Sequence, residues 1–240
     1  IRAKLEAEQG AESGLLVVSD MQSAGRGRRG RGWESPAGTN IYYTLMLKPD
    51  FSSDCAPMLT LVMALAVAKG IRQTLRRDSE EAAAKVGIKW PNDIVVDGKK
   101  VCGILTEMSM EQGYIQHIVI GVGINVRKQE FPEEIRDRAA AIDEQCGFRI
   151  SRSQLIADIM EAFEEDYKIF LQTHDLKGLR ASYAELLVNQ DREVCVLDPK
   201  GEYRGIARGI NDQGELLVER PNGNVEEVYA GEVSVRGIYG

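Results

Sequence analysis

The sequence lacks the features that mark several classes of protein. It has only two histidines and four scattered cysteines, Cys55, Cys102, Cys146 and Cys195, without a C-x-x-C pair. This scatter argues against a cysteine zinc site or a disulfide framework and indicates a reduced, cytoplasmic protein. No unbroken run of about 18 apolar residues occurs, and the first residues are charged, which argues against a membrane span or a signal sequence.

An excess of positive charge is also lacking. The 240 residues include 30 Lys and Arg against 37 Asp and Glu, a net charge of −7, whereas general polyanion binders usually have a basic surface. With 43% hydrophobic and 28% charged residues, the chain suits one sizeable core with a small appended module. The stretch GRGRRGR at residues 25–31 is therefore a local feature that needs a specific anion.

Hydrophobic spacing predicts an α+β domain over residues 1–190, in which a mixed central sheet is packed by helices. The first helix has no cap before it, so we expect the chain to be truncated at its start. We expect one helix from residue 1 to near Gly10 or Gly14, and others at 55–77, 153–171 (capped by Ser151 or Ser153) and 174–188. Strands are expected at 15–20 (buried), at 40–47 and in several segments within 88–126, and a charged connector is expected at 78–87.

The pattern changes after residue 190. Five short strands with polar turns follow, which predicts a small β-barrel over residues 191–240 that is too small to be rich in chemistry of its own. We interpret it as an accessory domain.

The Gly/Arg stretch could clamp a phosphate, because glycines let backbone amides approach an anion and arginines offer charged, planar forks. Gly25, Gly27 and Gly30 match the letters G-x-G-x-x-G, yet Trp33 and Pro36 prevent the helix that a dinucleotide fingerprint requires. From the residues alone, a solvated basic loop stays open as the alternative.

Two further segments mark strand ends with polar groups or glycine. Residues 89–105, KWPNDIVVDGKKVCGIL, combine a polar turn with Lys99 and Lys100 at the start of a strand, which favours a pocket but also fits a wet, charged hairpin turn. GVGIN at 121–125 suits either a β-bulge or a ligand contact.

Together these segments resemble the biotin protein ligase family, the biotin-acetyl-CoA-carboxylase ligases. Residues 19–47 are similar to the family's biotin and adenylate loop, IKWPND and KKVCGIL to its catalytic strand pair, and IGVGINV to its purine-contacting segment. ARGINDQGELLVE and GEVSVR are similar to its C-terminal SH3-like domain. The resemblance covers almost the whole chain.

The resemblance implies a two-step reaction. Biotin's carboxylate attacks the α-phosphate of ATP, giving biotinyl-5′-adenylate, and a lysine of a biotin carboxyl carrier domain then displaces AMP. Fixed positive charge and Mg²⁺ must offset the repulsion between the two anions of the first step.

Roles follow residue by residue from the resemblance. Lys100 is expected to contact both the biotin carboxylate and the phosphate, and its register with Gly103 favours it over Lys99, because neighbouring strand residues face opposite sides. Asp93 is expected to receive a proton from the incoming lysine or to cap its turn, or both. The remaining assignments are biotin contacts for Gln22, Gly25, Gly103 and Leu105, a carboxylate and phosphate loop with Arg26, Arg28 and Arg31 in which Arg28 holds the adenylate, and a purine contact for Asn125.

The chain departs from the family pattern in two places. A Ser-Thr-Asn segment that normally precedes the first helix is absent, so part of the biotin site is expected to be missing. No Trp follows GVGIN to cover the adenine, and Phe131 is the first aromatic residue there.

Two other functions compete with this interpretation. A lipoate-protein ligase would use similar chemistry, and an RNA-binding module would use Arg-Gly loops with Trp33, Tyr42 and Tyr43, although the net charge opposes the latter. Sheet edges could pair with a second copy or an acceptor domain, so a homodimer stays open, as does an upstream DNA-binding domain.

Overall fold

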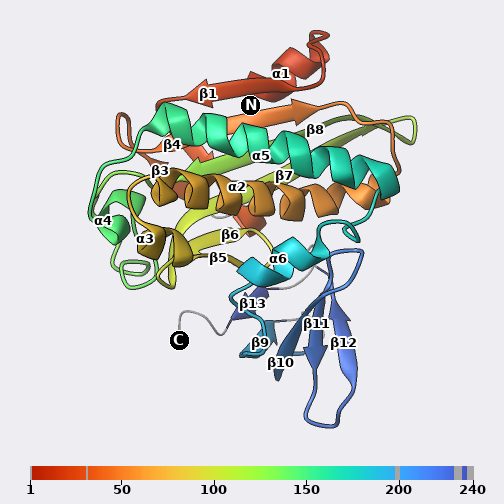
Figure 1. Ribbon diagram of the computed structural model, residues 1–240. Coiled ribbons are helices and arrows are strands. Elements are labelled where there is room, and N and C mark those ends of the chain that lie inside the picture. Colours follow the sequence, from red (N-terminus) through yellow and green to blue (C-terminus); the bar gives the residue numbers. More distant parts are fainter. Residues whose placement is uncertain (1, 31, 198–200, 230–233, 237–240) are drawn as a thin grey trace.

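The computed structural model describes residues 2–30, 32–197, 201–229 and 234–236 (Figure 1). A six-stranded sheet lies at the centre, in the order β1 (Leu15–Ser19), β4 (Ile41–Leu47), β8 (Tyr114–Ile124), β7 (Lys99–Glu111), β6 (Asp93–Val96), β5 (Val86–Lys89). The predicted α+β class is confirmed. All pairs between these strands are antiparallel, which corrects the expected mixed sheet. The isolated parallel bridges at Ile88–Leu187 and Lys100–Ala139 join the sheet to residues outside the named strands.

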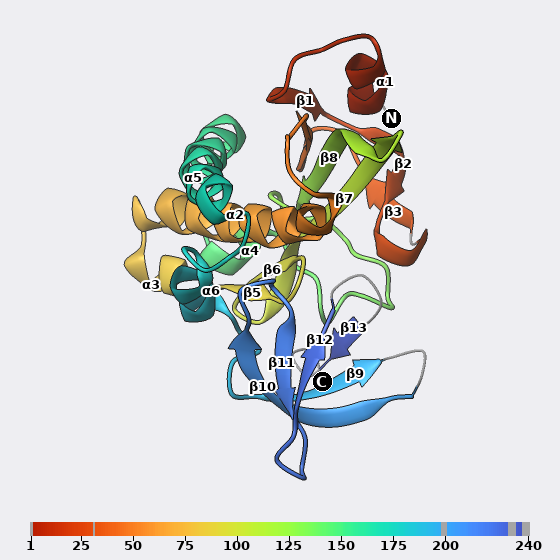
Figure 2. The same cartoon turned by 90° about the vertical axis from the view of Figure 1, so that its right-hand side faces the viewer.

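Two long helices cover one face of this sheet. Helix α2 (Leu59–Arg76) lies between the sheet and α5 (Arg152–Thr173), as Figure 2 shows. Because α2 is enclosed on both sides, it is apolar around most of its circumference. The segment Ser53–Arg76 is long and apolar enough to cross a membrane by composition, but 72% of its apolar window is buried, as expected for a core helix.

The opposite face carries smaller elements. Helix α1 (Arg2–Glu8) packs on β1, β4 and β8, and a two-stranded hairpin of β2 (Gln22–Arg26) and β3 (Gly32–Ser35) lies farther along (Figure 2). A short 3-10 turn, η1 (Arg28–Gly30), joins the two strands. The Gly/Arg stretch is therefore built into a hairpin on the side of the sheet away from α2 and α5.

The C-terminal strands form a second antiparallel sheet of the five short strands that were predicted, although among the described residues its two end strands do not pair to close the expected barrel. Its order is β12 (Val225–Val228), β11 (Leu216–Glu219), β10 (Tyr203–Ile210), β9 (Glu193–Leu197), β13 (Ser234–Arg236). Its turn at residues 211–214 contacts the large domain, since Trp90 Nε1 donates to the Gly214 carbonyl at 2.9 Å and the Leu176 amide donates to the Asp212 carbonyl at 2.7 Å. The small sheet thus rests on the segment that leads into β6.

Several helix predictions need correction. A helix over 174–188 is wrong in its first part, because His174 ends α5 in a left-handed conformation and α6 covers only Arg180–Leu186. The helix expected from residue 55 starts as a 3-10 segment, η2 (Ser53–Met58), and becomes α-helical at Leu59. Pro57 lies in this first segment, where its missing amide N–H is tolerated.

Two segments between helices and strands also differ from expectation. The charged connector contains α3 (Glu80–Ala84), whose N-cap Ser79 accepts a hydrogen bond from the Ala82 amide. Strand β1 is an edge strand and only partly buried, with Val18 54% exposed. Helix α4 (Ile142–Cys146) follows the loop after β8.

Candidate active site

A strip of glycines leaves part of the sheet free of side chains. Gly103 on β7 pairs with Gly123 on β8, and Gly121 pairs with Leu105. Their neighbours Ile104 and Val122 are buried in the core beneath α2, and alternation therefore turns the glycines toward the hairpin face. We call Gly103, Gly121 and Gly123 the glycine floor; they leave room for a ligand against the backbone.

Lys100 lies at one end of the glycine floor. Its Nζ is 2.6 Å from Asp93 Oδ1, and both side chains are about one-fifth exposed or less, at 20% and 17%. The same ammonium lies 4.8 Å from the centre of the Trp33 ring of β3, a cation–π contact. The hairpin therefore reaches over the floor and covers this lysine.

A β-bulge determines the direction of the Lys100 side chain. Ile94 pairs with Cys102 whereas Val95 pairs with Lys100, so Val101 is the extra residue on β7. In a regular strand, residues three apart face opposite sides. With the bulge, Lys100 lies against Gly103, where an added Cβ would meet the lysine Nζ at 3.2 Å.

Arg28 approaches the same place from the hairpin. Its Nη1 donates to Asn92 Oδ1 at 3.0 Å, and Asn92 directly precedes Asp93. The Asn92 side chain is held in turn, because its Nδ2 donates to the Ile104 carbonyl at 3.0 Å. Arg28 thus comes from 64 residues before Asn92 to the place where Asp93 and Lys100 meet on the neighbouring strands β6 and β7.

The other predicted residues lie at different distances from this centre. Gln22 accepts a hydrogen bond from Ser35 Oγ at 2.9 Å and lines an open cavity of about 400 Å³ beside Trp33. Leu105 follows Gly103 on the same face of β7. Asn125 stands at the end of β8, where its amide donates to the Val101 carbonyl at 2.7 Å.

Of the other predicted arginines, Arg26 is not brought to Lys100. Arg26 forms an ion pair with Glu107 of β7 at 2.9 Å, and Lys4 of α1 contacts the same carboxylate at 3.1 Å. Arg31 lies outside the described residues. Arg28 is therefore the predicted arginine that the described structure places beside the lysine.

Sequence reasoning missed three residues that shape the site: Trp33, Asn92 and Glu107. From the sequence, Trp33 stands out only as a helix breaker or an RNA-stacking residue, although an aromatic residue next to an arginine-rich stretch also suits a cation contact. The turn Trp-Pro-Asn-Asp offered Asn92 as a polar strand-end residue. Nothing in the spacing of β7 indicated that Glu107 would meet Arg26.

The arrangement suits the binding of an anion and the stabilisation of charge. Two fixed cations face an uncharged backbone surface, and one carboxylate stands within reach as a proton acceptor. Burial holds the pKa of the Cys102 thiol well above its ordinary value, so this thiol stays protonated and is no nucleophile. Among the described residues, no three His, Cys, Asp or Glu side chains converge as metal ligands.

Known proteins share both parts of this architecture. The sequence model of the Biotin/lipoate A/B protein ligase family matches residues 3–125, and that of the Biotin protein ligase C terminal domain matches residues 191–236. The biotin protein ligase from Aquifex aeolicus in complex with biotin and ATP superimposes with a TM-score of 0.81 at 28% identity, over 98% of this chain and 94% of that one.

Curated relatives agree with this match. The bifunctional ligase/repressor BirA of Bacillus subtilis is 36% identical over 231 residues, which cover 95% of this chain and 68% of the relative. The biotin–[acetyl-CoA-carboxylase] ligase of Paracoccus denitrificans is 29% identical over 97% of this chain and 95% of its own length. The sequence matches extend over both domains and include the strands that carry the site, and the fold agrees with them. The chain therefore belongs to the biotin protein ligase family.

Proposed function

We propose that this protein is a biotin–[acetyl-CoA-carboxylase] ligase, which joins biotin through a biotinyl-5′-adenylate to a lysine of a biotin carboxyl carrier domain. The observation that carries the proposal is the Lys100–Asp93 ion pair at the glycine floor, with Arg28 held on Asn92 beside it. In this geometry Lys100 and Arg28 supply fixed positive charge for the biotin carboxylate and the triphosphate. The Asp93 carboxylate lies nearby for the second step.

In the first step, a carboxylate oxygen of biotin forms a bond to the α-phosphorus of ATP, and the bond to the β-phosphate oxygen breaks to release pyrophosphate. Lys100 stabilises the charge that the carboxylate and the α-phosphate bring together. Arg28 holds the phosphate and then the adenylate. We treat Mg²⁺ as part of the magnesium–ATP substrate, because this ion keeps most of its ligands as water and phosphate oxygens.

In the second step, the amine of the acceptor lysine attacks the acyl carbon of the adenylate and AMP leaves. A free lysine has a pKa of about 10.4 and is protonated at neutral pH, so it must lose a proton before it can attack. Asp93 takes this proton. An anion bound to Lys100 competes with Asp93 for the ammonium and frees the carboxylate for this role.

Binding roles are assigned by position. Gln22, Gly25, Gly103 and Leu105 would surround biotin, Asn125 would contact the purine, and Arg31 would belong to the phosphate loop. Arg26 would add its charge there only by leaving its ion pair with Glu107. Residues 1–190 would form the catalytic domain, and residues 191–240 an SH3-like domain that supports ATP or acceptor engagement.

The cellular setting follows from chemistry and topology. The four cysteines are free thiols, which supports a reducing cytoplasm as the compartment.

The edge of the large sheet offers a surface for a second copy of the chain. Among the described strands, β1 pairs only with β4, so its outer edge could pair with the same strand of another copy. Sedimentation of the protein would test this homodimer.

A biotin-dependent ATP–pyrophosphate exchange assay tests the proposal, followed by labelling of a purified carrier domain. We expect exchange with biotin and none with lipoate. Exchange driven by lipoate alone would favour a lipoate-protein ligase, and RNA binding with steep salt dependence and no exchange would favour the RNA-binding hypothesis.

Arg28→Ala is expected to release the adenylate faster while leaving its formation less affected. The variant removes one of several charges at the phosphate, together with the contact to Asn92, and the adenylate has then lost a direct contact to the hairpin. We expect release of biotinyl-adenylate into solution to rise roughly tenfold, the scale of one charge-assisted hydrogen bond.

Chromatography of the reaction mixture without acceptor measures this release. Arg76→Ala is a matched control, because Arg76 pairs with Glu80 at an exposed site on α2. Release from Arg28→Ala equal to that from the control would contradict the role of Arg28.

A further inference from the structure

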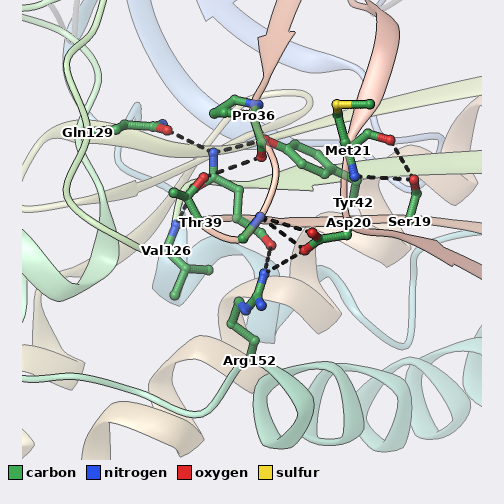
Figure 3. Close-up of polar contacts among 11 residues, drawn as sticks. Ser19, Asp20, Met21, Pro36, Thr39, Tyr42, Val126, Gln129 and Arg152 are labelled. Atoms are coloured by element: carbon green, nitrogen blue, oxygen red, sulfur yellow. Dashed lines mark hydrogen bonds and ion pairs between the residues drawn. The ribbon is translucent and has the colours of Figure 1, made fainter.

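Four residues meet where the segment that carries the hairpin leaves and rejoins the sheet. Asp20 directly follows β1, Gly38 and Asn40 precede β4, and Arg152 begins α5; we call these four residues the loop-base cluster. Figure 3 shows Arg152 pointing from α5 toward Asp20, with the strand ends on either side.

Hydrogen bonds join both ends of the hairpin segment within this cluster. Both carboxylate oxygens of Asp20 accept from the Gly38 amide at 3.1 Å. Arg152 Nη1 donates to the Asn40 carbonyl at 2.8 Å and to Asp20 Oδ1 at 3.3 Å (Figure 3). One guanidinium nitrogen therefore binds the outgoing and the returning strand at once.

The position of Arg152 in its helix is electrostatically unfavourable. It is the first residue of α5, after the N-cap Ser151, and the first turn of this helix contains no acidic residue. The N-terminus of a helix carries partial positive charge and favours anions over cations. The contacts to Asp20 and Asn40 compensate for this placement. The Arg152 side chain therefore interacts with the strand ends and not with its own helix.

Asn40 connects the cluster to the end of β8. Its side chain is 2% exposed: Oδ1 accepts from the Val126 amide, and Nδ2 donates to Tyr42 Oη and Gln129 Oε1, each at 3.0 Å. The Gln129 Nε2 in turn donates to Asn125 Oδ1 at 3.4 Å. The loop base thus has a fixed relation to the residue assigned to the purine.

We propose that Arg152 is a positioning residue that holds the β2–β3 hairpin closed over the glycine floor. It fixes both ends of the hairpin segment to α5, which packs firmly on the core helix α2. Without this tie Asp20, and through it the Gly38 amide, can move, whereas Asn40 stays held by its own side chain. The segment then pivots ahead of Asn40, and Arg28 and Trp33 move with it. This inference rests on the proposed function, because it concerns how the adenylate is retained.

The experiment compares Arg152→Gln with Arg152→Lys. Since a single nitrogen of Arg152 makes both contacts, a lysine ammonium can replace it, whereas the neutral glutamine removes the charge. We expect the adenylate to leave preformed complexes of Arg152→Gln roughly fivefold faster than those of the wild type, since the pair is partly exposed. Arg152→Lys should restore most of the retention, and the melting temperature should stay close to that of the wild type in both variants.

Lys168→Gln is the matched control, because it removes an exposed cation from the same helix. Asp20→Asn provides a second route: it keeps an acceptor for the Gly38 amide but loses the charge, and its effect should not add to that of Arg152→Gln. Faster release of the adenylate from Asp20→Asn alone would also test the inference if Arg152→Gln does not fold.

Wild-type release in Arg152→Gln, or in Asp20→Asn where the glutamine variant does not fold, would overturn the inference, as would a lysine variant no better than glutamine. Failure of the unmodified protein to form any adenylate would be distinguishable, because it would refute the proposed function and this inference with it.

Discussion

Lys100→Ala is expected to slow biotin-dependent ATP–pyrophosphate exchange by roughly 10²-fold or more, because an ammonium in a partly closed site contributes a few kcal/mol to the transition state. Its Nζ lies between Asp93 and the Trp33 ring, at the edge of the glycine floor. Arg28 is held on Asn92 nearby and stays in place in this variant. Removing Lys100 therefore leaves the repulsion between the carboxylate and the triphosphate only partly compensated.

Lys99→Ala separates this effect from a general loss of charge. Lys99 neighbours Lys100 on β7 but its side chain is exposed, so its loss should change the exchange rate little. Both variants must first show wild-type circular dichroism, because Lys100→Ala also leaves Asp93 without its partner. A larger loss in Lys99→Ala would mean that the catalytic assignment belongs to the wrong lysine.

Gly25→Ala is expected to have an effect of similar size through shape alone. An added Cβ at this buried position would lie 2.4 Å from the Trp33 carbonyl oxygen, 2.8 Å from Ser35 Oγ and 3.0 Å from Gln22 Oε1. Because one of these atoms belongs to the backbone of β3, the two hairpin strands must separate. A misplacement of about 1 Å in a positioned site costs roughly 10²-fold in rate, and we expect exchange to fall by about that factor.

Gly32→Ala is the matched control for this variant. Gly32 lies on the same hairpin, yet an added Cβ there would meet no atom within 4 Å, so exchange should stay near the wild-type rate. The melting temperature of Gly25→Ala should change little, since β2 and β3 form their own two-stranded sheet outside the core. Equal rates for the two alanine variants would show that the close strand contact at Gly25 is dispensable.

Much of the fold could be predicted because local pattern and burial agree. The run that forms β4 is apolar apart from Thr44, and β8 is apolar or glycine from Ile118 to Ile124. Strands of that kind need no distant information to be recognised. The cap of α5 at Ser151 was equally local. The helix expected from residue 174 failed because the helical spacing of the residues around the turn after α5 outweighed its one breaker, Gly178.

The site was less predictable, since its geometry depends on contacts between distant segments. Lys100 faces the same side as Gly103 only because of the bulge at Val101. No residue in this part of the sequence indicates a bulge. The ion pair of Arg26 with Glu107 joins positions 81 residues apart. Such pairings emerge only once the hairpin has been placed on the sheet.

The contact between Trp90 and the small sheet has a consequence for the exchange of modules between relatives. Trp90 is held at its amide by Asn189 and at its indole by the Gly214 carbonyl, and Asn92 and Asp93 follow it within three residues. Gly214 has a φ of +79°, and an added Cβ would lie 2.9 Å from Leu61 and from Leu176. In a chimera of this catalytic domain with the C-terminal module of a relative, the relative's turn would therefore replace Gly214 in the contact that holds Trp90, just before Asn92 and Asp93. If that turn does not fit against Trp90, Leu61 and Leu176, we expect both domains to fold and the chimera still to catalyse poorly.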